Sequence, residues 1–345
     1  MDDKKRNTTE PLIIAGTEIK RGTSVNIDMP LVRLYTDTEI NMPIHVRRAR
    51  KDGPTLFVSA AVHGDEINGI EIIRRIMRLK TLKLTSGTLI LAPMVNVYGV
   101  LNKSRYMPDR RDLNRSFPGS ENGSLAAVVA HRFLTEVVQH CDYGIDLHTG
   151  AIHRSNLPQI RANLEDDETT ELAKAFGVSV LMNSNLRDGS LREAASDSNT
   201  RILLYEAGEA LRFDELSIRA GQRGILNVLS TLGMINKPRR RQVATPYIAN
   251  TSSWVRAHHS GFVRNLRKMG DYVEKGDALA EIGSPMGETL GVVKARRGGI
   301  VIGKQNIPLV QKGDAMFYIA YFSEEDEEIA ENIQAMSEQL LPSQV

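Results

Sequence analysis

The stretch TLFVSAAVHGDEINGIEIIRRIM, residues 55–77, decides the fold of this chain. Its first half, residues 55–62, is apolar, partly β-branched and too short for a helix, so it predicts a buried strand. Its second half carries apolar residues three and four apart, which is the spacing of one helix face. These residues are Ile67, Ile70, Ile73 and Met77. A strand that leads directly into a helix is typical of an α/β fold.

The turn between this strand and helix contains His63 and Glu66. It lies at the carboxyl end of the strand, where ligands bind in open α/β sheets. The two residues supply a nitrogen and a carboxylate oxygen from one short turn, which is half of a zinc site. A histidine and a glutamate three residues apart also occur in ordinary polar turns, so a third ligand is needed.

A third ligand is available in the segment YGIDLHTG, residues 143–150. Here again a short apolar strand ends in a histidine, His148, which is followed closely by a glycine. The separation of 85 residues (148 − 63) leaves room for a passage that brings two parallel strands side by side. A catalytic zinc usually has three protein ligands and an open position for water. His63, Glu66 and His148 fit that pattern.

The composition is ordinary for a soluble globular protein, and we expect no nucleic-acid or membrane partner. The chain has 345 residues and a net charge of +2, which gives no case for a basic patch. Its single cysteine, Cys141, precludes an internal disulfide and fits a reducing compartment. No leader-like or membrane-length apolar run is visible, so we expect a cytoplasmic protein. The oligomeric state is left open, and a homo-oligomer is allowed.

Strands and helices alternate along most of the chain, which predicts a largely parallel sheet. Residues 1–50 read as an antiparallel β segment joined to a catalytic domain at 51–235. The stretch 96–123 is polar and has no clear period, so it predicts a long functional loop. Ser124 is placed to cap a helix that runs to about residue 140. The inward residues of that helix are predicted to be Leu125, Val128, Phe133 and Val137. Further strands are predicted at 88–95, 159–162, 178–182 and 201–205, and helices at 165–176, 190–196 and 214–232.

The last third of the chain changes character. Residues 250–322 contain short β-rich runs and frequent glycines, which predict a small all-β domain. This region resembles half of a biotinyl/lipoyl-type domain, with GDYVEKG at 270–276, but lacks the displayed lysine motif of a carrier. We therefore expect it to be structural or to shape access. The segment NKPRRR at 236–241 reads as a linker, and the acidic tail 323–345 as a short helix.

A zinc hydrolase also needs a base, a group that stabilises the oxyanion and a means of holding the substrate. The apolar strand that ends in Glu206 offers a base, and Glu209 is the fallback. The long loop offers arginines, whose planar fork suits carboxylates. Asp112 in the same loop could orient a metal-bound histidine.

Together these residues resemble the succinylglutamate desuccinylase/aspartoacylase family of zinc carboxypeptidase-like hydrolases. The matching pieces are HGDE at 63–66, the segment from Arg105 to Arg115, DLH at 146–148 and the strand-borne Glu206. The resemblance implies one Zn2+ per chain at His63, Glu66 and His148, with Glu206 as general base and acid. It also implies that Arg105 stabilises the oxyanion, and that Asn114 and Arg115 hold a substrate carboxylate.

The resemblance therefore predicts a zinc-dependent deacylase that hydrolyses the amide bond of a small N-acyl amino acid. Two alternatives are open. A metallocarboxypeptidase that acts on short peptides would use the same metal and the same carboxylate clamp. A catalytically silent member would bind a ligand or partner through its β domain, and loss of a zinc ligand or of the base would favour it.

Overall fold

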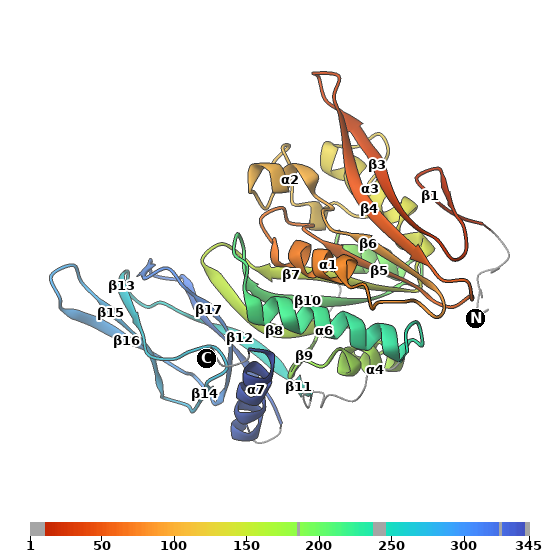
Figure 1. The fold of residues 1–345 in the computed structure, drawn as a ribbon. Coiled ribbons are helices and arrows are strands. Elements are labelled where there is room, and N and C mark those ends of the chain that lie inside the picture. The colour runs from red at the N-terminus through yellow and green to blue at the C-terminus, as the bar shows by residue number, and fades with distance from the viewer. Residues whose placement is uncertain (1–10, 185–186, 237–245, 324–325, 342–345) are drawn as a thin grey trace.

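The computed structural model describes residues 11–184, 187–236, 246–323 and 326–341. Its main feature is a mixed sheet with the strand order β12-β19-β17-β8-β10-β7-β5-β6-β4-β3 (Figure 1). The strands at its centre run parallel. They are β5 (Thr55–Ala60), β6 (Thr88–Ala92), β7 (Tyr143–Gly150) and β10 (Arg201–Glu209). The predicted α/β architecture is confirmed, and its parallel part is the centre of the sheet.

Antiparallel strands flank this centre on both sides. On one side β4 (Glu39–Arg48) pairs with β6 and with β3 (Ser24–Arg33), which confirms the predicted β edge. On the other side β8 (Arg154–Ala162) pairs antiparallel with β10. The sequence predicts only residues 159–162 of β8, because its polar first half does not alternate like a strand. The short strands β9 (Val180–Asn183) and β11 (Tyr247–Ala249) extend this side by parallel pairing with β8 and with each other. The strands β1 (Leu12–Ile14) and β2 (Thr17–Ile19) form a separate two-stranded sheet.

Helices cover both faces of the sheet. The helices α1 (Asn68–Arg78), α4 (Asp167–Phe176) and α6 (Glu215–Thr231) share one apolar core with the strands (Figure 1). The helices α3 (Leu125–Glu136) and α5 (Leu191–Ser196) share a second core on the opposite face. These helices lie close to their predicted positions.

The buried face of α1 differs from the prediction. Ile67 and Met77 are only half-buried, whereas Ile72, which the spacing left out, is fully buried. Ile72 fills the space that Gly221 of α6 leaves open, since a Cβ at Gly221 would lie 2.5 Å from the Ile72 Cδ1. The helix therefore buries a second stripe against α6 in addition to the stripe against the sheet.

The helix α3 begins at the predicted cap, where the Ser124 side chain accepts a hydrogen bond from the backbone of Ala127. It ends at Glu136, and a 3-10 turn (Val138–His140) follows it. Leu125 and Val128 are half-buried rather than inward. The buried residues recur three and four positions apart, which is the spacing of one helix face, and small side chains lie close to the sheet. They include Ala126, Val129, Ala130 and Phe133.

The predicted loop 96–123 contains two short elements. The helix α2 (Val97–Asn102) is capped by Asn96, and a 3-10 turn, η1 (Leu113–Arg115), is capped by Asp112. The prediction of a stretch without secondary structure is wrong here, because helices of one or two turns are too short to show a hydrophobic period.

The β-rich end of the chain forms a second sheet and also extends the first. The strands β12 (Thr251–Arg256), β17 (Gly299–Gln305) and β19 (Ala315–Tyr321) join the central sheet, where β17 pairs with β8. A separate four-stranded sheet follows the order β16-β15-β13-β18. Its strands are β13 (Gly261–Asn265), β15 (Ala278–Gly283), β16 (Thr289–Lys294) and β18 (Leu309–Val310), while β14 (Tyr272–Val273) pairs with β17. The predicted all-β region is confirmed, but the domain boundaries stay a prediction.

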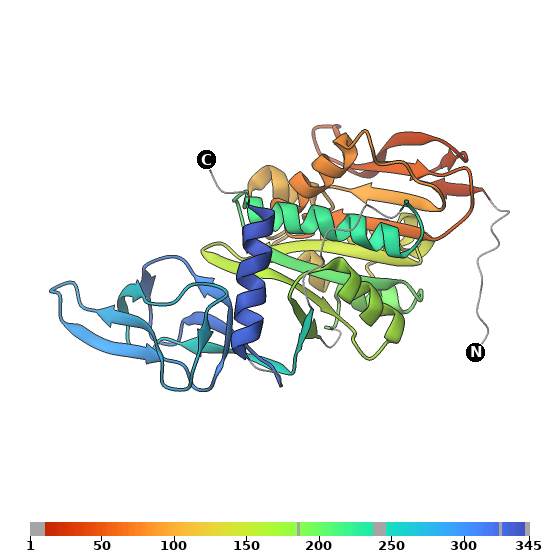
Figure 2. The same ribbon diagram turned by 60° about the horizontal axis from the view of Figure 1, so that its bottom comes forward.

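The tail forms the helix α7 (Asp326–Leu340), which lies between the β-rich end and α6 (Figure 2). Ile329 and Ile333 pack into the core of the β-rich end, whereas Met336 and Leu340 pack into the α1–α4–α6 core. The predicted linker 236–241 lies, apart from Asn236, outside the described residues. Among the described helices, none is long and apolar enough to cross a membrane.

Candidate metal centre and cavity

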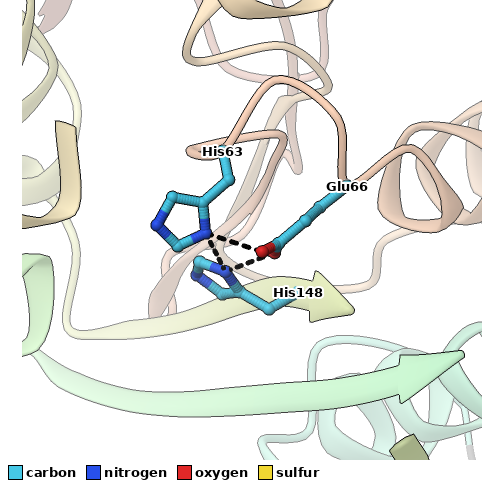
Figure 3. A group of neighbouring side chains, drawn as sticks. All are labelled: His63, Glu66 and His148. Atoms are coloured by element: carbon cyan, nitrogen blue, oxygen red, sulfur yellow. Dashed lines mark hydrogen bonds and ion pairs between the residues drawn. The ribbon is translucent and has the colours of Figure 1, made fainter. Parts of the chain in front are cut away.

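Three side chains at the carboxyl ends of β5 and β7 converge on one point (Figure 3). His63 Nδ1 lies 2.8 Å from Glu66 Oε1, and His148 Nδ1 lies 2.7 Å from Glu66 Oε2. The two histidine Nδ1 atoms are 3.2 Å apart. All three residues are buried, and one ligand atom from each lies within 4.8 Å of the others. This predicted group can therefore hold a metal ion.

The separation of the histidines suits a single tetrahedral ion. Two nitrogens each about 2.05 Å from one tetrahedral zinc would lie about 3.3 Å apart, close to the observed 3.2 Å. Two histidine nitrogens and a carboxylate oxygen are also ligand types that zinc accepts, so the donor set fits a zinc-like metal.

The local fold places these ligands through close backbone packing. Ala61 takes a left-handed conformation (φ 53°) directly after β5, which turns the chain towards His63. Gly64 lies against α2, where a Cβ would come within 2.0 Å of the Gly99 carbonyl carbon. The backbone nitrogen of Thr149 donates to Glu66 Oε2 at 3.1 Å. The turn that carries two ligands is therefore fixed by contacts with both α2 and β7.

The Nε2 atom of each histidine, on the opposite side of the ring from Glu66, contacts a second carboxylate. His63 Nε2 lies 3.1 Å from Asp112 Oδ1, as the sequence predicts for a residue that orients a metal-bound histidine. His148 Nε2 lies 2.7 Å from Asp146 Oδ2, and Asp146 also accepts a hydrogen bond from Ser59. Such carboxylates fix the ring orientation and the tautomer of a ligand. Asp146 was not predicted as a site residue, although its spacing of two on a strand places it on the same face as His148.

The charges of this group keep it ionised. Burial lowers the pKa of His63 and His148, but the carboxylates Glu66, Asp112 and Asp146 outweigh burial and raise the pKa of both rings. Burial likewise raises the pKa of Glu66, but the two histidines hold the pKa of that carboxyl well below its usual range. The ionised Glu66 carboxylate can therefore serve as an anionic ligand, and a metal ion would displace the protons from the two rings.

All seven residues predicted for the site line one cavity of about 230 Å³. Glu206 lies on β10 directly beside His148 in the strand register, and its Oε2 accepts a hydrogen bond from Asn156 at 2.9 Å. Glu209 is not among the lining residues. It accepts hydrogen bonds from the His153 backbone and from Asn306 instead. The geometry therefore favours Glu206 over the fallback.

The loop residues lie around the same cavity. Arg105 donates to Glu66 Oε1 at 3.2 Å and to Asp112 Oδ2 at 3.1 Å, so it lies beside the metal group. Asn114 is buried, and its Oδ1 accepts a hydrogen bond from the Leu191 backbone at the start of α5. Arg115 follows on η1 and is exposed at the cavity. The predicted loop residues are thus brought together with the metal group.

The far wall of the cavity is missed by the sequence analysis. It contains four further arginines and an aromatic pair from the β-rich end. Trp254 of β12 stacks on Tyr318 of β19, with ring centroids 4.8 Å apart. The four arginines are Arg154, Arg161, Arg187 and Arg192. The sequence gives one sign of this wall, because Arg161 is a charged residue within the predicted strand 159–162. Trp254 and Tyr318 thus bring the β-rich region into the cavity wall, and its role as a structural or access-shaping region stays a prediction.

The comparison with protein families agrees with this fold and site. The profile described as the succinylglutamate desuccinylase/aspartoacylase catalytic domain matches residues 52–232. The chain therefore belongs to the succinylglutamate desuccinylase/aspartoacylase family. The matched range contains His63, Glu66, His148 and Glu206, whereas Trp254 and Tyr318 lie beyond it.

Relatives are similar over most of their length. The N-alpha-acetyl-L-2,4-diaminobutyric acid deacetylase of Halomonas elongata is 27% identical over 81% of this chain and 86% of its own. The crystal structure of a succinylglutamate desuccinylase/aspartoacylase from Rhodobacter sphaeroides is 26% identical, with a TM-score of 0.76 over 88% of this chain and 97% of that chain. The product-bound ectoine utilization protein EutE (DoeB) of Ruegeria pomeroyi shares the fold, with 24% identity and a TM-score of 0.78 over 91% of this chain and 98% of that chain. The family and the relative's name indicate a hydrolase that removes an acyl group from an amide.

Proposed function

We propose that this protein is a cytoplasmic, zinc-dependent amidohydrolase that removes the acyl group from a small N-acylated amino acid. The observation that carries the proposal is the common cavity of the His63–Glu66–His148 group, Glu206 and Arg115. Membership of the deacylase family and the similarity to the Halomonas elongata deacetylase support it.

The metal ligands and Glu206 would have separate roles in the reaction. When bound by His63, Glu66 and His148, zinc would supply a Lewis acid that activates water and polarises the scissile carbonyl. Glu206 would accept a proton from the attacking water and deliver it to the leaving amine. Asn156 holds one oxygen of Glu206, which fixes the direction of the carboxylate.

The remaining residues would bind and orient the substrate. Arg105 lies beside the metal group, where its positive charge would stabilise the developing oxyanion. Asn114 and Arg115 would hold the substrate's carboxylate, with the guanidinium of Arg115 making two parallel hydrogen bonds.

The size of the cavity favours a deacylase over a carboxypeptidase. Its volume of about 230 Å³ is smaller than the roughly 300–1,000 Å³ of pockets that hold drug-sized ligands. Trp254 and Tyr318 wall it on the far side, so it suits one amino acid with a short acyl group better than a peptide. A catalytically silent member is disfavoured, because the predicted ligands and the base are all present and converge.

The test combines metal content with turnover. Elemental analysis should give about one zinc per chain for the wild type and for His258→Ala, an exposed histidine on the β-rich region, but much less for His63→Ala and His148→Ala. The zinc-loaded protein should hydrolyse members of a panel of N-acyl amino acids faster than dipeptides. Equal metal content in all four proteins would exclude the proposed centre, and preference for dipeptides would favour the carboxypeptidase.

A further inference from the structure

The strand β10 contains an extra residue directly after Glu206. Glu206 and Glu209 are three residues apart (209 − 206), whereas their partners on β7, His148 and Gly150, are two apart (150 − 148). Such a β-bulge bends the strand and redirects the side chains beside it, and bulges are frequent next to active sites. The direction of the Glu206 side chain therefore depends on how this bulge is held.

The bulge also sets where Glu206 meets its hydrogen-bond partner. Gly208, within the bulge, has a positive φ of 75°, which is the left-handed conformation that glycine adopts without steric cost. In the register with β8, Gly208 lies opposite Asn156. The side chain of Asn156 donates to Glu206 Oε2 at 2.9 Å. A shift of the bulge would therefore move Glu206 and Asn156 relative to each other.

The side chain of Asn68, at the start of α1, holds the bulge. Its Nδ2 donates to the Ala207 carbonyl at 3.3 Å, and its Oδ1 accepts from the Asp214 backbone nitrogen at 2.9 Å. A Cβ at Gly208 would lie only 2.4 Å from Asn68 Nδ2, so the amide packs directly against the bulge. Asn68 is 1% exposed, so water cannot replace these bonds without a rearrangement. An amide meets both needs because it carries a donor and an acceptor on one short side chain.

The same contacts join the base strand to the turn that carries two metal ligands. Asn68 follows the ligand Glu66 by two residues. The backbone carbonyl of Asp65 accepts a hydrogen bond from the Leu211 nitrogen at 2.8 Å, which is a second link to the segment after β10. A general base must lie within hydrogen-bond reach of the proton that it abstracts. The separation between the metal ligands and Glu206 is therefore set in part by this junction.

We infer that Asn68 is a positioning residue for the general base, because it holds the bulge at Ala207 and Gly208 and so fixes the direction of Glu206 towards the metal group. This inference rests on the proposed function, in which Glu206 is the base. Asn68 is not among the residues that line the cavity. It therefore acts through Glu206 and not on the substrate.

The test uses two substitutions of Asn68 and one matched control in the zinc-loaded full chain. Asn68→Asp keeps the shape and the acceptor but places a carboxylate oxygen against the Ala207 carbonyl. Asn68→Ala removes both hydrogen bonds. The control is Asn227→Asp, because the half-buried Asn227 on α6 also donates to a backbone carbonyl, that of Phe176, at 3.2 Å. The control loses a similar bond that has no link to β10.

Both Asn68 variants should keep their zinc and a nearly unchanged KM, while kcat falls about 10- to 100-fold because the base is misplaced. In a Glu206→Gln background, Asn68→Asp should lower kcat by less than about twofold, because the group that it positions is already disabled. Asn227→Asp should have no effect on kcat in either background. Loss of kcat by Asn68→Asp to the same degree in both backgrounds, as a general structural defect produces, would overturn the inference, and so would an unchanged kcat.

Crystal structures of the zinc-loaded wild type and of Asn68→Asp add a measurement that needs no turnover. The hydrogen bond between Asn156 and Glu206, 2.9 Å in the wild type, should be lost in the variant, while the three metal ligands keep their places. An unmoved Glu206 would overturn the inference. The proposed function fails separately, if the wild type hydrolyses no N-acyl amino acid or if Glu206→Gln stays fully active. The position of Glu206 in the variant decides the role of Asn68 in either case.

Discussion

Replacing Asp146 with asparagine tests how the metal group is held. Asp146 is fully buried, and its two oxygens accept from His148 Nε2 at 2.7 Å and from Ser59 at 2.8 Å. Asparagine has nearly the same shape, and its NH2 group can donate to the serine hydroxyl. The histidine keeps an acceptor but loses the negative charge that makes its Nδ1 a strong ligand. Removing such a partner typically costs 10- to 100-fold in metal affinity, which is about 1.4–2.7 kcal/mol.

The structure predicts a ranking between the two supporting carboxylates. Asp112 lies 3.1 Å from His63, is 17% exposed at its side chain and is shared with Arg105. Asp112→Asn should therefore weaken zinc binding less than Asp146→Asn. Competition with a chromogenic chelator gives both affinities, and thermal denaturation of the metal-free proteins separates loss of binding from loss of fold. Zinc affinity of Asp146→Asn within about twofold of the wild type would refute this reasoning, because losing such a partner should cost about tenfold or more.

Three other substitutions test the site and its surroundings. Glu206→Gln should keep its zinc while kcat falls by about 10²–10⁴-fold, whereas Glu209→Gln should stay near wild type; the reverse result would reassign the base. Hydrogen bonds from Arg75 and Arg219 lower the pKa of Glu215 to about 2 from its ordinary 4.5. Because the folded pKa is depressed, this stabilisation is complete above about pH 5 and is lost as the pH falls towards 2. Glu215 is 41% exposed, so Glu215→Gln should lower the free energy of unfolding at neutral pH by only about 1 kcal/mol. Urea denaturation should show that this gap closes near pH 3, and a constant gap would contradict it.

The metal group could be predicted because it follows from local patterns. His63 and Glu66 lie in the turn after β5, His148 lies near the end of β7, and parallel neighbouring strands end at the same edge of a sheet. The observed register pairs Ala60 with Leu147, so the residues that come next, including His148, lie beside the turn that carries His63. Nothing beyond strand length and polarity was needed for that prediction.

The far wall could not be predicted in the same way. Arg161 and Tyr318 are 157 residues apart (318 − 161), and they meet because β8 pairs with β17 and β17 with β19. No local pattern fixes which distant strands pair, since every strand edge offers the same hydrogen-bonding groups. The buried stripe of α1 was missed for a related reason, because Ile72 is buried by a gap at Gly221 on another helix.

The pairing of β17 with β8 also has a consequence for how the chain is made. The ligand turns and Glu206 are synthesised first, but the edge of β8 at Arg154 to Asn156 is covered only when β17 arrives. Gly303 of β17 then packs behind Asn156, the residue that holds Glu206. Until that moment the nascent protein has an open strand edge, which invites pairing with other chains. A chain that stops near residue 235 would thus carry the reactive groups without the cover that keeps them soluble and aligned. We therefore expect residues 51–235 alone to be less soluble than the full chain.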